Sequence, residues 1–153
     1  MVDFIGPNIN LCSSSKTKSS ALKELCYMLY VNGCISDKKK FCEAVYRRER
    51  VGVTGMENGI AIPHGESDAA LRAAIGVLKT RSIIGDWESL DNKPIKLVFL
   101  LVVPTKNRNI EHLKLLSHLA AALTHSDIQD RLLKEDSVES FKKIFYKSWE
   151  CEK

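Results

Sequence analysis

Long hydrophobic runs are scarce in this chain of 153 residues. The longest extends from Leu97 to Val103, far short of the ~20 apolar residues that a membrane-spanning helix needs. The first residues also lack a basic stretch followed by a sustained apolar one, so we expect no secretory signal. These absences predict a soluble, cytoplasmic protein that does not insert into a membrane.

Motifs for metals, disulfides and nucleotides are missing as well. The five cysteines include no Cys-x-x-Cys pair, and an odd number leaves at least one thiol unpaired. Reduced thiols in a cytosolic protein explain this most simply. There is no His-Glu-x-x-His helix and no Gly-x-x-x-x-Gly-Lys-Ser/Thr loop. We therefore expect neither a bound metal nor a cofactor.

Positive charge is only weakly in excess over negative charge. The 23 Lys and Arg against 19 Asp and Glu give a formal net charge of +4, and the basic residues are spread out except at 38–40 and 47–50. Binding of nucleic acid needs several phosphate contacts from one basic face, often with interleaved aromatic residues. We expect no nucleic-acid partner and interpret the lysine run as a solvated helix face.

The length fits one compact domain with a single core, because chains usually divide into domains only when they are longer. We expect one domain over residues 1–153, with its core at about 11–147. The Ser- and Lys-rich stretch 10–20 is expected to be a loop. Apolar residues three and four apart then predict one helix ending at Gly33 and a second, capped by Asp37, running to about Arg50.

Short apolar runs predict strands at 60–62, 73–78 and 95–103. The last strand has no polar alternation, which indicates burial on both faces. Further helices are expected from 110 to about 123, at 127–134 and at 138–147. This order predicts an α+β fold of three layers (α/β/α), in which helices flank both faces of a mixed sheet of about five strands.

The most informative residues are those around His64. The apolar run 60–62 leads to Pro63, whose φ is fixed, then to the histidine and to Gly65, which has no side chain. Such a segment would hold an exposed imidazole in one direction. At neutral pH much of an imidazole is uncharged with a free lone pair, so it can act as a nucleophile. A Pro-His-Gly turn is also an ordinary way to leave a strand, so a structural role for this histidine stays open.

Three runs resemble the fructose/mannitol-type enzyme IIA family of the bacterial sugar phosphotransferase system, also called the type-2 EIIA domain. The run TGMENGIAIPHG at 54–65 is similar to that family's active-site signature. The run YRRERVG at 46–52 resembles the Arg-Glu element that ends its second helix, and EHLKLL at 111–116 resembles its His-Leu-x-x-Leu helix. The resemblance extends from about Leu11 to Tyr146.

The resemblance implies a phosphotransferase that works through a phosphohistidine. His64 matches the histidine that takes a phosphoryl group from the carrier protein HPr and donates it to a cysteine of enzyme IIB. His112 matches a second histidine that stabilises the phosphoryl group, and Arg48 matches a nearby arginine. The sugar stays open, because substrate choice in these systems lies mainly with the membrane component.

These roles are chemically reasonable. Phosphoryl transfer requires alignment and positive or hydrogen-bonding groups around the phosphoryl oxygens. His112 is expected in the first turn of its helix, where free backbone N–H groups favour an anion, and Arg48 carries a planar guanidinium that fits phosphate. A surface ion pair is the alternative for Arg48. His118 lies six residues after His112, which is unsuitable for a shared metal, and His125 is expected to cap a helix or to lie on the surface.

Three other functions are open. Nitrogen-related IIA proteins share the histidine motif but regulate target proteins according to phosphorylation state, and the run DNKP at 91–94 resembles both branches. A pure interaction module would give His64 a structural role only. A hydrolase would need a base beside water, for which Glu57 and Glu66 are the nearby carboxylates.

Overall fold

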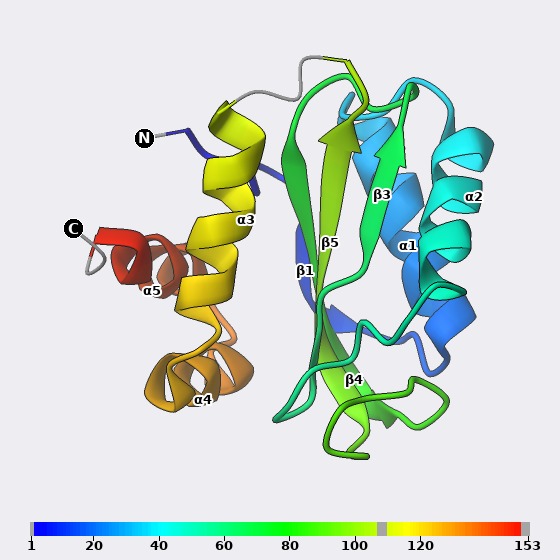
Figure 1. The fold of residues 1–153 in the computed structure, drawn as a ribbon. Helices are drawn as coiled ribbons and strands as arrows, with labels where there is room; N and C mark the ends of the chain where they lie inside the picture. Colours follow the sequence, from blue (N-terminus) through cyan, green and yellow to red (C-terminus); the bar gives the residue numbers. More distant parts are fainter. Residues whose placement is uncertain (1, 107–109, 151–153) are drawn as a thin grey trace. The chain divides into compact units, whose positions relative to one another are not determined.

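The structure is a computed structural model that describes residues 2–106 and 110–150, with the side chains of 110–113 and 150 outside the description. The chain divides into two compact units, Met1–Asn107 and Arg108–Lys153, each with its own internal packing (Figure 1). The first unit contains the sheet and two helices, and the second contains three helices.

A mixed five-stranded sheet forms the centre of the first unit. Its order is β1-β4-β5-β2, and β3 pairs with β5 on the same side as β2. Only the β4–β5 pair is antiparallel. Apolar side chains on β5 are buried on both faces, as expected from their lack of alternation. The strands are β1 (Ile9–Ser13), β2 (Ile60–Ala61), β3 (His64–Ser67), β4 (Ala74–Ile84) and β5 (Ile95–Pro104).

The two short strands β2 and β3 are parts of one interrupted edge strand. Ile60 pairs with Leu97, and His64 pairs with Leu101, so the same offset along β5 continues across the gap. Pro63 lies in the gap and has no N–H to offer a neighbouring strand. Proline is tolerated at this position because the strand lies at the edge of the sheet.

Two antiparallel helices, α1 (Lys18–Val31) and α2 (Lys38–Glu49), cover one face of this sheet (Figure 1). Thr17 caps α1 in a capping box with Ser20, and the Asp37 side chain accepts the Lys40 amide at the start of α2. Both helices end close to the predicted residues. The expected apolar stripes are all buried: Leu22, Leu25, Cys26 and Leu29 on α1, and Phe41, Ala44 and Val45 on α2.

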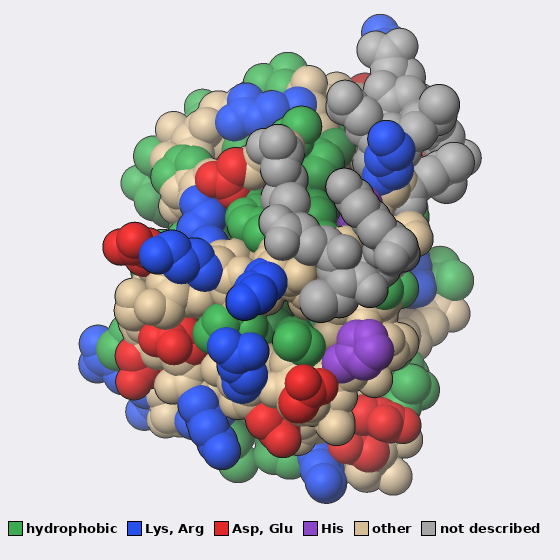
Figure 2. Space-filling view, turned by 90° about the vertical axis from the view of Figure 1, so that its left-hand side faces the viewer, with side chains coloured by type: hydrophobic (Ala, Val, Ile, Leu, Met, Phe, Trp, Pro, Cys, Tyr) green, Lys and Arg blue, Asp and Glu red, His purple; other side chains and the backbone are tan. Residues whose placement is uncertain are grey.

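The second unit consists of α3 (Ile110–Ala122), α4 (Ser126–Lys134) and α5 (Val138–Glu150). The aromatic residues of α5 pack against one another, with the Trp149 ring 5.1 Å from Phe145 and 5.0 Å from Tyr146 between centroids. None of the described helices is both long and apolar enough to cross a bilayer. Figure 2 shows basic and acidic side chains interspersed over the face that it draws.

The predicted mixed sheet of about five strands with helices, an α/β fold with an open sheet, is confirmed. Two local predictions were wrong. Residues 10–13 belong to β1 rather than to a loop, because they pair in parallel with β4. The strand predicted at 73–78 continues to Ile84. The single-domain prediction stays a prediction.

Candidate functional site

The turn that precedes the histidine depends on two residues with left-handed backbone conformation. Asn58 has a φ of 62° and Gly59 a φ of 78°. Asparagine and glycine are the residues that adopt this region most readily. The Ile62 amide then donates to the Thr54 carbonyl at 2.9 Å, so the chain folds back as it enters the edge strand. The predicted Asn-Gly turn is confirmed.

A second loop, residues 88–94, holds this turn in place. The Asn58 backbone N–H donates to the Asp91 carboxylate at 3.0 Å, and the Leu90 amide donates to the Gly55 carbonyl at 3.1 Å. The hydrogen bond from Asn58, with others from Lys93 and Ser89, holds the pKa of Asp91 below its ordinary value. The DNKP segment at 91–94 therefore supports the histidine segment from a distant part of the sequence.

His64 is the first residue of β3 and is half-buried. The sequence predicted a strand only over 60–62, with the histidine at its end; β3 itself was not predicted. The edge strand resumes after Pro63, whose carbonyl accepts the Leu101 amide at 2.9 Å. The backbone before and after His64 is thus held by pairing with β5.

Gly65 lets α2 pack directly onto this strand. A Cβ atom at Gly65 would lie 2.5 Å from Phe41 Cζ and 2.8 Å from Val45 Cγ2, both on α2. Because side chains alternate along a strand, the neighbouring His64 side chain extends from the opposite face of the sheet. Close packing of α2 on one face therefore leaves the half-buried His64 side chain on the other, with its Nδ1 atom buried.

Arg48 lies in the last turn of α2 and is partly exposed. Its guanidinium Nη1 donates to the Gly52 carbonyl at 3.3 Å. In Figure 1, α2 and β3 run in opposite directions, so the end of α2 and the start of β3 lie at the same end of the pair. The fold thus brings the segments that carry Arg48 and His64 together, and the contact of Arg48 with a phosphoryl group stays a prediction.

Glu49 was not among the predicted site residues, yet it organises this end of the unit. Its side chain is only 6% exposed and forms an ion pair with Lys18 at 2.9 Å. The Glu49 carboxylate also accepts the Thr54 hydroxyl at 2.8 Å, and Thr54 in turn accepts Trp87 Nε1 at 3.2 Å. A carboxylate in the last turn opposes the helix dipole, which is the sequence feature that could have indicated a buried partner.

The remaining histidines belong to the second unit. His112 lies in the first turn of α3, as predicted, but its side chain lies outside the described residues. His118 stacks on Trp149, with ring centroids 4.8 Å apart and an interplanar angle of 11°. His125 is the N-cap residue of α4 and is exposed, but its side chain makes no capping hydrogen bond.

The carboxylates considered for a hydrolase are both exposed: Glu57 in the turn and Glu66 on β3. Among the side chains that the structure describes, those of residues 2–106 and 114–149, no three His, Cys, Asp or Glu lie together in a way that could hold a metal ion.

Comparison with known proteins shows the family to which this architecture belongs. Residues 6–148 match the family described as "Phosphoenolpyruvate-dependent sugar phosphotransferase system, EIIA 2". A fructose-specific EIIA component of Haloferax volcanii is 30% identical over 136 residues, covering 89% of this chain and 87% of the relative.

Two solved structures are similar over most of the chain. The nitrogen regulatory protein IIA-Ntr of Neisseria meningitidis gives a TM-score of 0.82 at 30% identity, covering 91% of this chain and 93% of the other. The mannitol IIA enzyme of Escherichia coli, solved as a complex with its phosphorylated IIB enzyme, gives 0.76 at 20% identity, covering 93% and 96%. At 20% identity, the similarity to the mannitol enzyme shows only that the fold is shared. On the family match, the chain belongs to the type-2 EIIA family of the phosphoenolpyruvate-dependent sugar phosphotransferase system.

Proposed function

We propose that this chain is a cytoplasmic phosphocarrier that accepts a phosphoryl group from phosphorylated HPr on His64. It then donates the group to a cysteine of an enzyme IIB in the uptake of a fructose- or mannitol-like sugar. The observation that carries the proposal is the half-buried His64 at the break in the edge strand, within the segment that matches the family.

The local structure suits a nucleophile that must meet two different proteins in turn. The Asn58-Gly59 turn, Asp91 and the pairing with β5 restrain the backbone on both sides of His64. Restraint of the backbone limits the imidazole to few orientations, which lowers the entropic cost of alignment. His64 is half-buried, and the proposal requires its ring to meet a donor and then an acceptor.

In each step one bond to phosphorus forms and one breaks. A ring nitrogen of neutral His64 attacks the phosphorus of phosphorylated HPr and forms an N–P bond, while the N–P bond to the HPr histidine breaks. A cysteine thiolate of IIB then attacks the same phosphorus and forms an S–P bond, and His64 leaves as a neutral imidazole. Both steps require only positioning and stabilisation of charge on the phosphoryl oxygens.

The proposal is tested by incubating the chain with phosphoenolpyruvate, enzyme I and HPr, followed by mass spectrometry of the intact protein at neutral pH. We expect one phosphoryl group on the native chain and none on His64→Ala. His125→Ala is the matched control, because this histidine is exposed in the second unit and should leave phosphorylation unchanged. Full phosphorylation of His64→Ala would overturn the assignment.

Arg48 and His112 are proposed to stabilise the phosphoryl group. Loss of one such donor slows a charged transfer step by roughly tenfold or more. We therefore expect Arg48→Ala and His112→Ala to be phosphorylated on His64 but to transfer more slowly to IIB in a rapid-quench assay. Arg47→Ala is the control for Arg48, since Arg47 is its exposed neighbour in the same turn. Native rates for the two variants would remove these residues from the site.

A regulatory role of the nitrogen type is the second candidate, and the similarity to the IIA-Ntr structure favours it. The two roles differ in the fate of the phosphoryl group. A transport component passes it rapidly to the cysteine of a IIB from the same organism, whereas a regulator retains it and binds a target in only one phosphorylation state. Transfer to purified IIB, followed on the acceptor cysteine by mass spectrometry, distinguishes them.

A further inference from the structure

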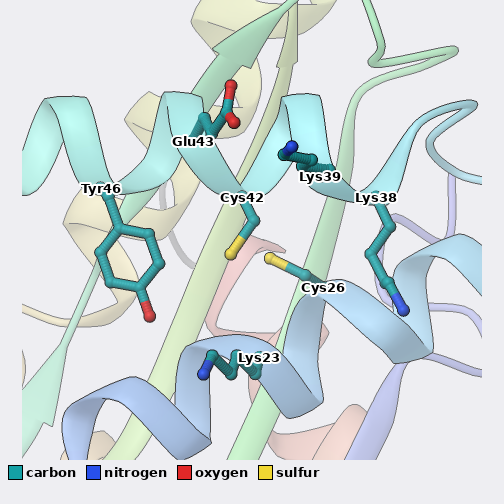
Figure 3. Close-up of a pocket in the computed structure, with 7 residues that line it drawn as sticks. All are labelled: Lys23, Cys26, Lys38, Lys39, Cys42, Glu43 and Tyr46. Carbon is teal, nitrogen blue, oxygen red and sulfur yellow. The ribbon is translucent and has the colours of Figure 1, made fainter.

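Two thiols from neighbouring helices meet in the first unit, away from His64. Cys26 on α1 and Cys42 on α2 point toward one another across the helix pair (Figure 3). Both cysteines are free, and each thiol shifts the pKa of the other. Cys26 is 1% exposed, whereas Cys42 is half-buried. The pair therefore consists of one hidden thiol and one thiol that a small molecule can reach.

A cavity of about 390 Å³ leads to this pair from the surface. Both cysteines line it, together with Lys23 of α1 and Lys38, Lys39, Glu43 and Tyr46 of α2. Its lining is mostly apolar, which suits a small neutral molecule. A hydrogen peroxide molecule is far smaller than this cavity and needs no rearrangement of the helices to reach Cys42.

The pKa values of the two thiols are shifted in opposite directions. The hydrogen bond from the Cys26 thiol, with the positive charges of Lys23 and Lys38, lowers the pKa of Cys42 to about 7 against the opposing effects of burial and Glu43. The Cys42 hydrogen bond and burial raise the pKa of Cys26. Near neutral pH about half of Cys42 is thiolate, whereas an ordinary cysteine with a pKa of about 8.5 is only a few per cent thiolate.

The other described cysteines lack this arrangement. Cys12 lies exposed on β1, where its sulfur accepts Arg81 Nε at 3.1 Å. Cys34 is buried and accepts Asn8 Nδ2 at 3.3 Å. The hydrogen bonds of their sulfur atoms in the described part of the chain are to nitrogen donors, not to a second thiol, so the two cysteines serve as internal controls.

We propose that Cys42 is an oxidation site for hydroperoxides and that Cys26 is its resolving thiol. The Cys42 thiolate attacks the terminal oxygen of the peroxide, whose O–O bond breaks, giving a sulfenic acid and one molecule of water or alcohol. The Cys26 sulfur then attacks the Cys42 sulfur, the S–O bond breaks, and a second water leaves with the Cys26 proton. Two thiols are oxidised to one disulfide and one peroxide is reduced.

The proposed Cys26–Cys42 disulfide would connect α1 to α2, the helix that packs on β3, which carries His64. Cys42 follows Phe41, which contacts Gly65 beside His64. The chemistry at Cys42 is nevertheless independent of the proposed phosphoryl transfer, because neither thiol takes part in that reaction. Failure of one proposal therefore leaves the other standing.

The test uses the full chain, reduced and then freed of reductant, with hydrogen peroxide added in slight excess at pH 7. Remaining thiols are blocked with N-ethylmaleimide and the unreduced protein is digested and mapped by mass spectrometry. We expect a cross-linked peptide pair that contains Cys26 and Cys42, absent from Cys42→Ser and Cys26→Ser. It should persist in the double variant Cys12→Ser/Cys151→Ser.

The order of the two steps is tested with a sulfenic-acid trap. With dimedone present, Cys26→Ser should be labelled at Cys42, whereas Cys42→Ser should not be labelled at Cys26. In the native chain Cys42 should react with peroxide faster than Cys12 at pH 7, because only Cys42 has a second thiol beside it and a lowered pKa. Absence of the Cys26–Cys42 bridge in the native chain, or equal dimedone labelling of the two variants, would overturn the proposal.

Discussion

Gly65 sets how closely α2 approaches the histidine strand, and this can be tested by adding one methyl group. In Gly65→Ala the new Cβ would lie 2.5 Å from Phe41 Cζ, and Phe41 is fully buried and has little room to move. We expect a loss of about 1–3 kcal/mol in the free energy of unfolding, the usual cost of overpacking. Urea denaturation followed by far-UV circular dichroism measures it.

Gly85→Ala is the matched control. A Cβ at Gly85 would meet nothing within 4 Å, and the residue does not have a left-handed φ. Its stability should stay within about 0.5 kcal/mol of the native value. Equal effects of the two substitutions would show that the contact with α2 does not constrain residue 65.

Asp91 makes the support of the histidine segment dependent on pH. Its pKa is lowered in the folded protein, first by the hydrogen bond from the Asn58 backbone. The stabilisation is therefore fully present above the unfolded-state value of about 3.9 and is lost as pH falls through the lower folded-state pKa. We expect Asp91→Asn to melt below the native chain at pH 6 and the difference to shrink below pH 4. Thermal melts from pH 2 to pH 7 check this, and a constant difference would contradict it.

At the scale of the elements, Glu49 connects the end of α2 to the start of α1 and to the signature segment. The Glu49 side chain is 6% exposed. Replacing it with alanine removes the acceptor of the Thr54 hydroxyl and the ion-pair partner of Lys18. The Lys18 side chain is 26% exposed and stays partly hydrated, so loss of this charged hydrogen-bond partner costs about 1–3 kcal/mol. We expect a fall of that order in the free energy of unfolding, measured by urea denaturation.

The pair Glu139–Lys143 on α5 provides the control. It spans 3.4 Å with both side chains more than three-quarters exposed. Exposed pairs of this kind contribute about 0.5 kcal/mol or less, so Glu139→Ala should have little effect. If Glu49→Ala were equally mild, the network around Thr54 would not stabilise the first unit.

The helices and strands that could be predicted are those whose own sequence contains an apolar stripe at helical spacing or an unbroken apolar run. Leu22, Leu25 and Leu29 indicate α1 by their spacing, and the unbroken apolar run in 95–103 indicates a central strand. The strands β1 and β3 could not be predicted in this way. The residues His-Gly-Glu-Ser of β3 have no apolar alternation, and they are extended only because β5 offers them hydrogen bonds.

The candidate site shows the same division between local and distant causes. The Asn-Gly turn and the position of His64 follow from neighbouring residues in the sequence. The carboxylate of Asp91 and the network of Glu49 depend on contacts between segments more than thirty residues apart, or between two helices, which periodicity does not report. The family resemblance located the histidine and the arginine, but it did not explain how they are supported.

At the scale of the whole molecule, the two compact units raise the question of whether the chain unfolds in one step. The second unit, Arg108–Lys153, is close to the size of about 40 residues below which a chain rarely folds without help. We therefore expect one cooperative transition, as the single-domain prediction requires.

The chain offers one tryptophan in each unit to test this: Trp87 in the first and Trp149 in the second. Both are buried, so the fluorescence of each should change when its surroundings unfold. In Trp149→Phe the signal reports the first unit, and in Trp87→Phe it reports the second. Each fluorescence transition in urea should coincide with the circular-dichroism transition of the same variant, because a single domain loses both units together. A fluorescence midpoint well apart from the circular-dichroism midpoint in either variant would instead show that the two units unfold separately, as two domains do.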